Sequence, residues 1–358
     1  MASTSPAEIS LLRDLVATPS VSGTEERVAA LVEDTARAWG LDVVRDATSV
    51  RIEVAARSAG RTLALVSHLD VVPPGEGWTR DPFTPVIEGG KLYGRGSGDA
   101  KASVAAMLHA ARDVAESGGP ATGRLLVILG YEEETRRTTM GEAVQAAGPL
   151  DAAVVGEPTN LEISIAQRGL MMVDLIARGD QRHAGYAADD GSFTSAVTTL
   201  ARDLLALDGL FRDRPHPILG NPTVTATMLQ AGVSRNVTPP AAKAVLDVRS
   251  TPSWTHEELA DGIRRAVRSE MVVTSDRLVS CETPAASRLL GRALAVHPGA
   301  KTFGSPTCSD WVFLRHLDAI KCGPGTSRRS HTADEYVDLP EVTAARAFYG
   351  RLAREYLS

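Results

Sequence analysis

The chain has 358 residues, of which 43% are hydrophobic and 23% charged, and its formal net charge is −6. This length exceeds that of one typical domain, and the composition is ordinary for a globular protein with a sizeable core. The acidic balance disfavours nucleic acid or an anionic membrane as a partner. The three cysteines have no CxxC spacing, which indicates a reducing compartment rather than a disulfide framework.

No targeting or membrane-spanning segment is predicted. The N-terminal stretch MASTSPAEISLLRDL lacks a basic region followed by an apolar one, so we do not expect a secretory signal. No uninterrupted apolar run approaches the roughly 18–20 residues of a membrane span. The sequence therefore predicts a cytoplasmic protein.

Helices and short apolar runs alternate over the first half of the chain. The second predicted helix spans 22–40, where Ser22 and Glu25 fit a capping box and Gly40 fits a C-terminal stop. Further helices are expected at 6–20, 100–117 and about 141–148, and strands at 62–68, 124–130 and 151–158. Such alternation predicts an α/β fold with a mostly parallel central sheet covered by helices.

The pattern changes between about residues 168 and 277. Two strand–helix units with a strand pair between them are expected there, at 169–179, 192–207, 222–232, 241–251 and 255–271. This order indicates an inserted α+β domain of ferredoxin-like type. The α/β pattern then returns, so we assign 1–167 and 278–358 to one domain and 168–277 to the insertion.

Acidic and histidine side chains follow the predicted strand ends. They are His68 and Asp70 after the first run, Glu132, Glu133 and Glu134 after the second, Glu157 after the third, and His331 after a later one. The turn GRGSGDAK adds Asp99 just before a helix. Because parallel α/β sheets bind ligands outside the carboxyl ends of their strands, these side chains are expected to meet.

Each of these residues alone has an ordinary structural interpretation. A lone histidine is more often structural, a glutamate triplet is usually a solvated surface, and Asp99 could cap a helix. Together, however, they would repel one another unless a cation held them. Imidazole and carboxylate ligands without cysteine suit zinc, manganese or cobalt, and their number favours two ions sharing a bridging carboxylate. Asp70, at i+2 from His68, lies on the same strand face and is expected to orient the imidazole.

The motifs that carry these residues resemble one known family over essentially the whole chain. SHLDVVP, GRGSGDAK, EEET, VGEPTN, NVTPPAAKAVLDVR and GPGTSRRSHTADEY resemble those of the M20 metallopeptidase and deacylase family. That family includes acetylornithine deacetylases, succinyl-diaminopimelate desuccinylases and aminoacylases. The form of DPFTPVIEGGKLYGRGS, GEPTN and SHTADEY is most similar to acetylornithine deacetylases and the related acyl-ornithine and acyl-lysine hydrolases.

The resemblance implies a role for each residue of the acidic cluster except Glu132, which fills a variable acidic position and would at most support its neighbours. It implies a dinuclear site for two Zn²⁺ ions, or Co²⁺ or Mn²⁺, with Glu133 as general base and Asp70 orienting His68. The implied metal ligands are His68 and Glu157 for one ion, Glu134 and His331 for the other, and Asp99 between them.

The resemblance also implies that the insertion is a lid through which the chain forms a homodimer. Its His183 matches a histidine that polarises the scissile carbonyl. Asn236 and Arg249 match positions that bind the substrate, for which the guanidinium fork of arginine is suited. Gly325, in the GPGT motif, is a further candidate for substrate contact.

The implied activity is hydrolysis of the amide bond of a small N-acyl amino acid, first of all N2-acetyl-L-ornithine in arginine biosynthesis. N-succinyl-ornithine, acetyl-citrulline and a carrier-protein-linked lysine or ornithine are alternatives, and a catalytically inactive amino-acid-binding homologue is another. The pairs Arg136–Arg137 and Arg328–Arg329 flank Glu134 and His331. They are either surface charge or a positive rim that favours an anionic acyl group.

Overall fold

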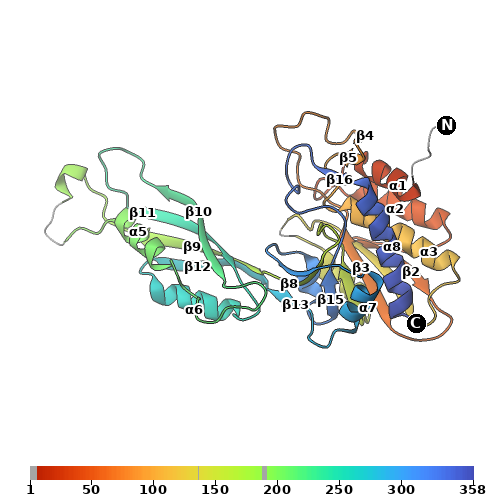
Figure 1. The fold of residues 1–358 in the computed structure, drawn as a ribbon. Coiled ribbons are helices and arrows are strands. Elements are labelled where there is room, and N and C mark those ends of the chain that lie inside the picture. Colours follow the sequence, from red (N-terminus) through yellow and green to blue (C-terminus); the bar gives the residue numbers. More distant parts are fainter. Residues whose placement is uncertain (1–5, 136, 188–191) are drawn as a thin grey trace. The chain divides into compact units, whose positions relative to one another are not determined.

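The computed structural model describes residues 6–135, 137–187 and 192–358, and the chain divides into two compact units (Figure 1). Unit 1 comprises Met1–Ile165, Glu282–Phe303 and Ser309–Ser358, and unit 2 comprises Ala166–Cys281 and Gly304–Cys308. The short second segment of unit 2 has no counterpart in the sequence-based division. Each unit is described by itself below.

Unit 1 is built on a nine-stranded sheet with the order β1-β2-β6-β3-β7-β15-β8-β13, with β14 paired to β8. These strands are β1 (Asp42–Arg45), β2 (Ser49–Ala55), β3 (Thr62–His68), β6 (Arg124–Gly130), β7 (Ala152–Val155), β8 (Ile163–Gln167), β13 (Cys281–Glu282), β14 (Thr302–Ser305) and β15 (Asp318–Lys321). The central strands β6, β3, β7 and β15 are parallel, whereas β1, β2 and β8 pair antiparallel. The predicted α/β class with a mostly parallel central sheet is confirmed.

Helices cover this sheet and bury its central strands along nearly their whole length. They are α1 (Ala7–Val16), α2 (Glu26–Ala38), α3 (Lys101–Glu116), α4 (Met140–Ala147), α7 (Arg288–Val296) and α8 (Leu339–Tyr356), with the 3₁₀ turn η2 (Asp310–Leu314). Every residue of β3 and β7 is buried, as expected for parallel strands covered on both faces. A small sheet of β4 (Val86–Glu88), β5 (Lys91–Tyr93) and β16 (Tyr336–Asp338) completes the unit.

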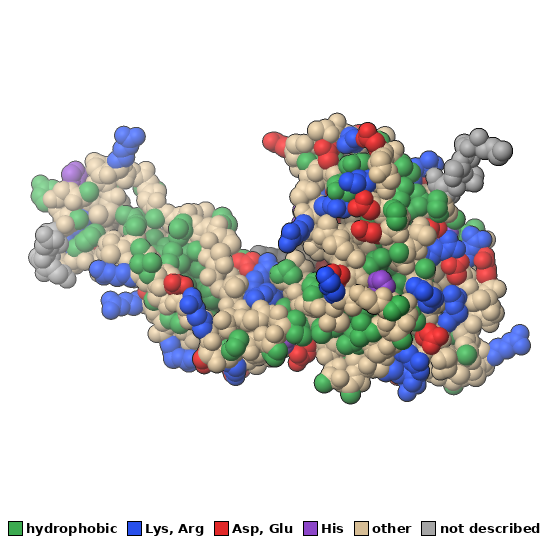
Figure 2. Space-filling view, viewed as in Figure 1, with side chains coloured by type: hydrophobic (Ala, Val, Ile, Leu, Met, Phe, Trp, Pro, Cys, Tyr) green, Lys and Arg blue, Asp and Glu red, His purple; other side chains and the backbone are tan. Residues whose placement is uncertain are grey.

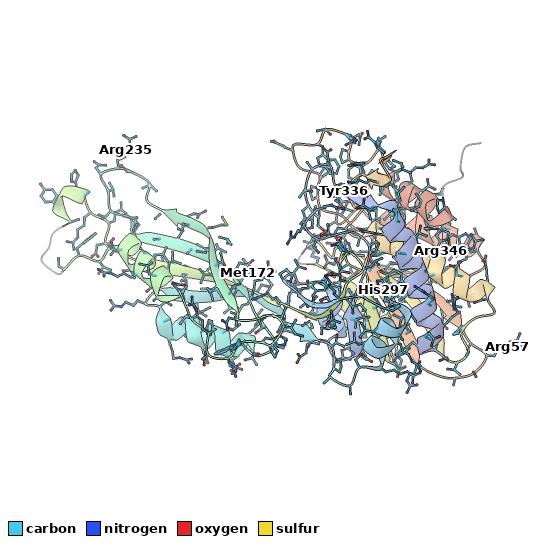
Figure 3. All side chains as sticks on the ribbon, viewed as in Figure 1. Arg57, Met172, Arg235, His297, Tyr336 and Arg346 are labelled. Atoms are coloured by element: carbon cyan, nitrogen blue, oxygen red, sulfur yellow. The ribbon has the colours of Figure 1, made fainter. Side chains whose placement is uncertain are left out.

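Polar side chains fix three of these helices to one another. Arg346 of α8, labelled in Figure 3, makes a two-point ion pair with Asp113 of α3 at 2.7 and 2.8 Å and bonds to Glu8 of α1 at 2.7 Å. The buried Nζ of Lys101, in the first turn of α3, donates to the carbonyl oxygens of Leu15 and Thr18 at 2.9 Å each. The start of α3 is thereby held against the end of α1.

The capping box predicted for α2 is wrong. Glu25 occupies the N-cap position but makes no side-chain cap bond, and the Ser22 hydroxyl donates instead to Asp70. The Glu25 carboxylate accepts from the backbone N–H groups of Gly23 and Glu132. Both side chains therefore serve the turn that carries the acidic triplet rather than the helix. The predicted stop at Gly40 agrees with its φ of 74°.

Unit 2 contains a four-stranded antiparallel sheet with the order β10-β11-β9-β12. Its elements run β9 (Leu170–Arg178), η1 (Ala184–Tyr186), α5 (Ala196–Ala206), β10 (Thr223–Ala231), β11 (Ala241–Arg249), α6 (His256–Ala266) and β12 (Glu270–Leu278). This is the ferredoxin-like βαββαβ order expected of the insertion. The helix predicted to reach residue 271 ends at Ala266, because the alternating residues of β12 pair with β9.

Among the described residues, no helix is long and apolar enough to cross a membrane. The cytoplasmic location stays a prediction.

The histidine of α3 makes the stability of the fold depend on pH. His109 is buried against Trp39, with ring centroids 4.7 Å apart, and neither ring nitrogen has a hydrogen-bond partner among the described residues. Burial lowers the pKa of His109 from 6.5 to about 4. Between these values the unfolded chain binds a proton that the folded chain does not, so the free energy of unfolding falls as pH falls from 6.5 towards 4.

We expect the free energy of unfolding, measured by urea denaturation, to be lower at pH 5 than at pH 7 because of this proton. Replacing His109 with Phe, which keeps an aromatic ring against Trp39, should remove about 1–2 kcal/mol of the stability lost between the two pH values. Equal losses in the wild type and H109F would contradict the assignment.

Candidate metal centre

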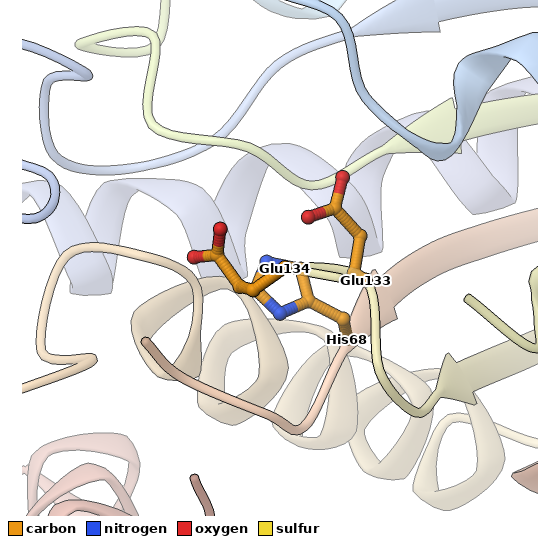
Figure 4. Close-up of side chains that lie close together, drawn as sticks. All are labelled: His68, Glu133 and Glu134. Atoms are coloured by element: carbon orange, nitrogen blue, oxygen red, sulfur yellow. The ribbon is translucent and has the colours of Figure 1, made fainter. Parts of the chain in front are cut away.

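The predicted acidic cluster forms because the carboxyl ends of three parallel strands meet. β3 ends at His68, and its neighbours β6 and β7 end at Gly130 and Val155. The turn after β6 brings Glu133 and Glu134 beside His68 (Figure 4). The turn after β7 brings Glu157 to the same edge.

His68 is oriented by the residue two positions further along the chain. Its Nδ1 donates to the backbone carbonyl of Asp70 at 3.0 Å and lies 3.4 Å from the Asp70 carboxylate. Because a carbonyl oxygen only accepts, Nδ1 carries a proton, and in the neutral imidazole the lone pair is on Nε2. Nε2 is buried and has no hydrogen-bond partner in the described part of the chain. It is therefore available to bind a cation.

The buried carboxylate of Asp70 also holds the acidic turn. Its two oxygens accept the backbone N–H groups of Glu133 and Glu134 at 2.9 and 3.1 Å, and the Ser22 hydroxyl adds a third bond at 2.7 Å. On the preceding residue, Glu132, φ is 55° and the N–H donates to Glu25 at 3.1 Å. One carboxylate thus positions the imidazole and the two glutamates together.

The ligand atoms form groups of the size that a metal ion needs. Three sets each place their ligand atoms within 4.8 Å of one another, namely His68–Asp99–Glu157, Asp99–Glu134–His331 and His68–Glu133–Glu134. Asp99 belongs to the first two sets. One of its oxygens lies 3.4 Å from His68 Nε2, and the other lies 3.7 Å from His331 Nε2. It therefore lies between two candidate positions and does not cap α3, whose N-cap is Ala100.

The electrostatics of the cluster favour the binding of a cation. Burial and the neighbouring Glu157 raise the pKa of Glu133 well above its usual range, and burial and Asp99 raise the pKa of Glu157 to about 8. Burial alone would lower the pKa of His68, but the neighbouring carboxylates of Asp70 and Asp99 raise it well above its usual range. Without a cation, protons must balance these carboxylates.

The residues present fit divalent metal ions. The buried Nε2 of His68 faces Asp99 at 3.4 Å and Glu157 at 3.9 Å without bonding to either. Imidazole and carboxylate donors without a thiolate are the set that zinc, cobalt or manganese uses in catalytic sites. His68 and Glu157 would hold one ion, Glu134 and His331 the other, and Asp99 would bridge them.

Three charged residues next to the cluster were missed by the sequence analysis. Asp310, at the start of η2, is buried and accepts the Thr138 hydroxyl at 2.8 Å, and burial raises its pKa to about 7. Arg95 and Glu335 form a buried ion pair beside Asp99. Glu335 belongs to the SHTADEY motif, but no spacing rule connects this glutamate with Arg95, which is 240 positions away in the sequence.

None of the four predicted substrate residues belongs to the ligand groups found among the described residues. His183, Asn236 and Arg249 belong to unit 2, where His183 and Asn236 are exposed neighbours and Arg249 forms an ion pair with Asp247 at 2.7 Å. Gly325 belongs to unit 1, where it is buried and its N–H donates to Glu341. The roles given to these four residues stay predictions.

The structure describes three of the four arginines that flank Glu134 and His331 in the sequence. Arg136 lies outside the described residues. Arg329 forms an ion pair with Asp338 at 3.1 Å and lies over the ring of Tyr336, so its guanidinium is already used in contacts within the chain. Arg137 and Arg328 are exposed, and neither guanidinium pairs with a carboxylate in the described ranges. These two remain candidates for contact with an anion.

Comparison with known proteins identifies relatives of the whole chain. The model of peptidase family M20/M25/M40 matches residues 64–355. The chain is 32% identical to succinyl-diaminopimelate desuccinylase 2 of Ruegeria sp. (strain TM1040), over 83% of this chain and 80% of that protein. It is 29% identical to succinyl-diaminopimelate desuccinylase of Phenylobacterium zucineum, over 98% of each protein.

Solved structures share the fold. An M20 family metallo-carboxypeptidase from Sulfolobus solfataricus superposes with a TM-score of 0.81 at 17% identity, covering 98% of this chain and 99% of that one. A dinuclear metal binding peptidase of the M20 family from Bacillus subtilis gives a TM-score of 0.78 at 17% identity, covering 98% and 97%.

Metal binding is expected to release protons, because the raised pKa of Glu157, about 8, leaves this carboxyl protonated in the metal-free chain at neutral pH. The apparent affinity for Zn²⁺ should fall as pH falls below 8, by up to about tenfold per unit for each proton displaced. Calorimetric titration of chelator-treated protein at pH 6.5 and 8, in buffers of different ionisation enthalpy, measures the proton count. A count of zero at pH 6.5 would contradict the expectation.

Proposed function

The chain belongs to peptidase family M20/M25/M40, and on this premise we propose that it removes the N-acyl group of an acylated diamino acid. It is a metal-dependent amidohydrolase of this family that acts on N-acyl amino acids. The observation that carries the proposal is the pair of ligand groups that share Asp99, with Glu133 beside them. A catalytically inactive homologue would be expected to lack a metal ligand or the base. Here the five candidate ligands and the candidate base are all present, namely His68, Asp99, Glu134, Glu157, His331 and Glu133.

Glu133 is the proposed general base. Its carboxylate lies in one ligand-sized group with His68 and Glu134, and its raised pKa suits a group that must both take and return a proton. The bound ions would supply Lewis-acid polarisation of the scissile carbonyl and a lowered pKa for the attacking water. Glu133 takes the proton of that water and delivers it to the leaving amine. His183 of unit 2 is proposed to donate to the carbonyl oxygen as negative charge develops there.

The acyl group is the finer part of the proposal, and charge separates the two leading candidates. The relatives from Ruegeria and Phenylobacterium are succinyl-diaminopimelate desuccinylases, and a succinyl group ends in a carboxylate. Arg137 and Arg328 offer exposed guanidinium groups in the turns that carry Glu134 and His331. We therefore place N-succinyl-diaminopimelate first. N2-acetyl-L-ornithine, in arginine biosynthesis, stays the second candidate because of the form of the GEPTN and SHTADEY motifs.

Unit 2 is proposed to mediate homodimer formation and to act as a lid. β10 is the edge strand of its sheet, and nearly all of its residues are exposed. Met228 and Leu229 on this strand are 53% and 63% exposed, and Leu205 of α5 is 77% exposed. Figure 2 shows hydrophobic side chains on the surface of unit 2 where Figure 1 places α5 and β10. A long exposed edge strand with apolar side chains favours pairing with a second copy.

Replacing Glu133 with Gln tests the base. The amide keeps the shape of the side chain but cannot take a proton, so kcat should fall by about 10²–10⁴ or more while two metal ions per chain stay bound. E132Q is the matched control, since it removes the same charge from the adjacent residue and should keep near-normal kcat. A near-normal rate in E133Q would show that another group is the base.

A substrate panel with arginine variants tests the acyl group. We expect kcat/KM to be highest for N-succinyl-diaminopimelate among succinyl-, acetyl-, formyl- and carrier-linked forms of diaminopimelate, ornithine, lysine and citrulline. R137Q or R328Q should raise KM for the succinyl substrate about tenfold and leave that for acetylornithine unchanged, because a charge-assisted bond is lost only with the anionic acyl group. R57Q, an exposed arginine of unit 1, is the control. Highest kcat/KM for N2-acetyl-L-ornithine would select the second candidate.

The dimer is tested by placing a charge on the exposed edge. L229D should convert a dimer into a monomer in light scattering, because a buried unpaired carboxylate opposes strand pairing. V44D changes an equally exposed valine on β1 of unit 1 and should leave the mass unchanged. A wild-type monomer at micromolar concentration would contradict the proposed partner.

A further inference from the structure

A buried glutamate outside the ligand set holds the turn that carries Asp99. The Glu335 side chain is 1% exposed, and its oxygens accept the backbone N–H groups of Gly96, Gly98 and Asp99 at 3.2, 2.9 and 3.0 Å. The turn is therefore wrapped around one carboxylate. The backbone closes the same contact, because the N–H of Gly94 donates to the carbonyl of Glu335 at 2.9 Å.

The negative charge of Glu335 is balanced by an arginine of the same chain, and in this respect Glu335 differs from the candidate metal ligands. Arg95 donates to it at 2.5 Å from a guanidinium that is itself buried. That guanidinium also bonds to the carbonyl of Pro74 at 3.1 Å and lies over the ring of Trp78. Glu335 takes part in none of the three ligand-sized groups of the described residues. Its carboxylate therefore accepts from backbone and arginine donors and is not a candidate metal ligand.

Glu335 lies four positions after His331 in the same irregular segment, where both His331 and Asp334 have positive φ. A single side chain thus connects the two ligands, Asp99 and His331, that come from turns far apart in the sequence. The neighbouring Asp334 also crosses between segments, but it bonds to the N–H and hydroxyl of Thr79 and not to the Asp99 turn.

We propose that Glu335 is a positioning residue that sets the placement of Asp99 relative to His331 and so the affinity of the position formed by Asp99, Glu134 and His331. The inference rests on the metal-dependent function proposed above. Without the Glu335 carboxylate the Asp99 turn loses its hydrogen bonds and relaxes, so Asp99 moves away from His331. His68 and Glu157 stay in place because they follow β3 and β7 directly. Outer residues that orient metal ligands typically contribute 10–100-fold to metal affinity.

The experiment compares E335Q with D334N, which removes the same charge from the adjacent residue. Chelator-treated proteins are titrated with Co²⁺ or Zn²⁺ in the absence of substrate, and the two equivalents are followed by calorimetry and by the Co²⁺ absorption spectrum. We expect the second equivalent to bind at least about tenfold more weakly to E335Q, with a smaller change in the first, and both to bind D334N as in the wild type. The kcat of E335Q should recover when the metal concentration is raised, with KM unchanged.

A second variant separates positioning from folding. E335Q leaves the buried Arg95 without its carboxylate, so R95M/E335Q removes both charges and avoids that loss of stability. The double variant should still bind the second ion weakly. Wild-type affinity for both ions in E335Q or in R95M/E335Q overturns the inference, and so does equal weakening in D334N. Fewer than two ions bound to the wild type overturns the proposed function itself, and the inference with it.

Discussion

Negative charge gathered at one edge of a buried sheet is the constraint on which the rest of unit 1 depends. Asp99, Glu133, Glu134 and Glu157 converge there with two histidines, and burial opposes the charged forms of Glu133 and Glu157. Such a set persists only if cations or protons balance it. The charge that would be costly without counter-ions is also what suits this edge of the sheet to divalent ions.

A second set of carboxylates holds the candidate metal ligands in place but belongs to none of the ligand groups. Asp70 accepts the N–H groups of Glu133 and Glu134, Glu25 accepts that of Glu132, and Glu335 accepts those around Asp99. In each case an irregular turn, which cannot satisfy its own backbone donors, closes on a buried side chain. The precision of the ligand cluster therefore comes from backbone hydrogen bonds to side chains that contribute nothing to the chemistry directly.

The sequence predicted much of the fold because its central strands and helices have strong local patterns. The largely apolar strands β3, β6 and β7 and the periodic helices α1, α3 and α8 were recognisable alone. The predicted helix at 255–271 covered only the first two residues of β12, and the rest of this strand was not predicted, because its alternation matters only when β9 lies beside it. β1 and β2 were not predicted either. Ser22 and Glu25 matched a capping box by spacing, but turns brought from other strands compete for their side chains.

By itself, the sequence determined which residues stand at the strand ends, and with them the ligand types and the family resemblance. That is possible because parallel strands place their carboxyl ends at a common edge whatever the loops do. Only the tertiary structure decided that Asp99 belongs to two ligand groups, that the Asp70 carboxylate binds backbone N–H groups of the acidic turn, and that the ion pair of Arg95 and Glu335 bonds to the Asp99 turn. These contacts join segments separated by tens to hundreds of residues, and local spacing carries no information about such distances.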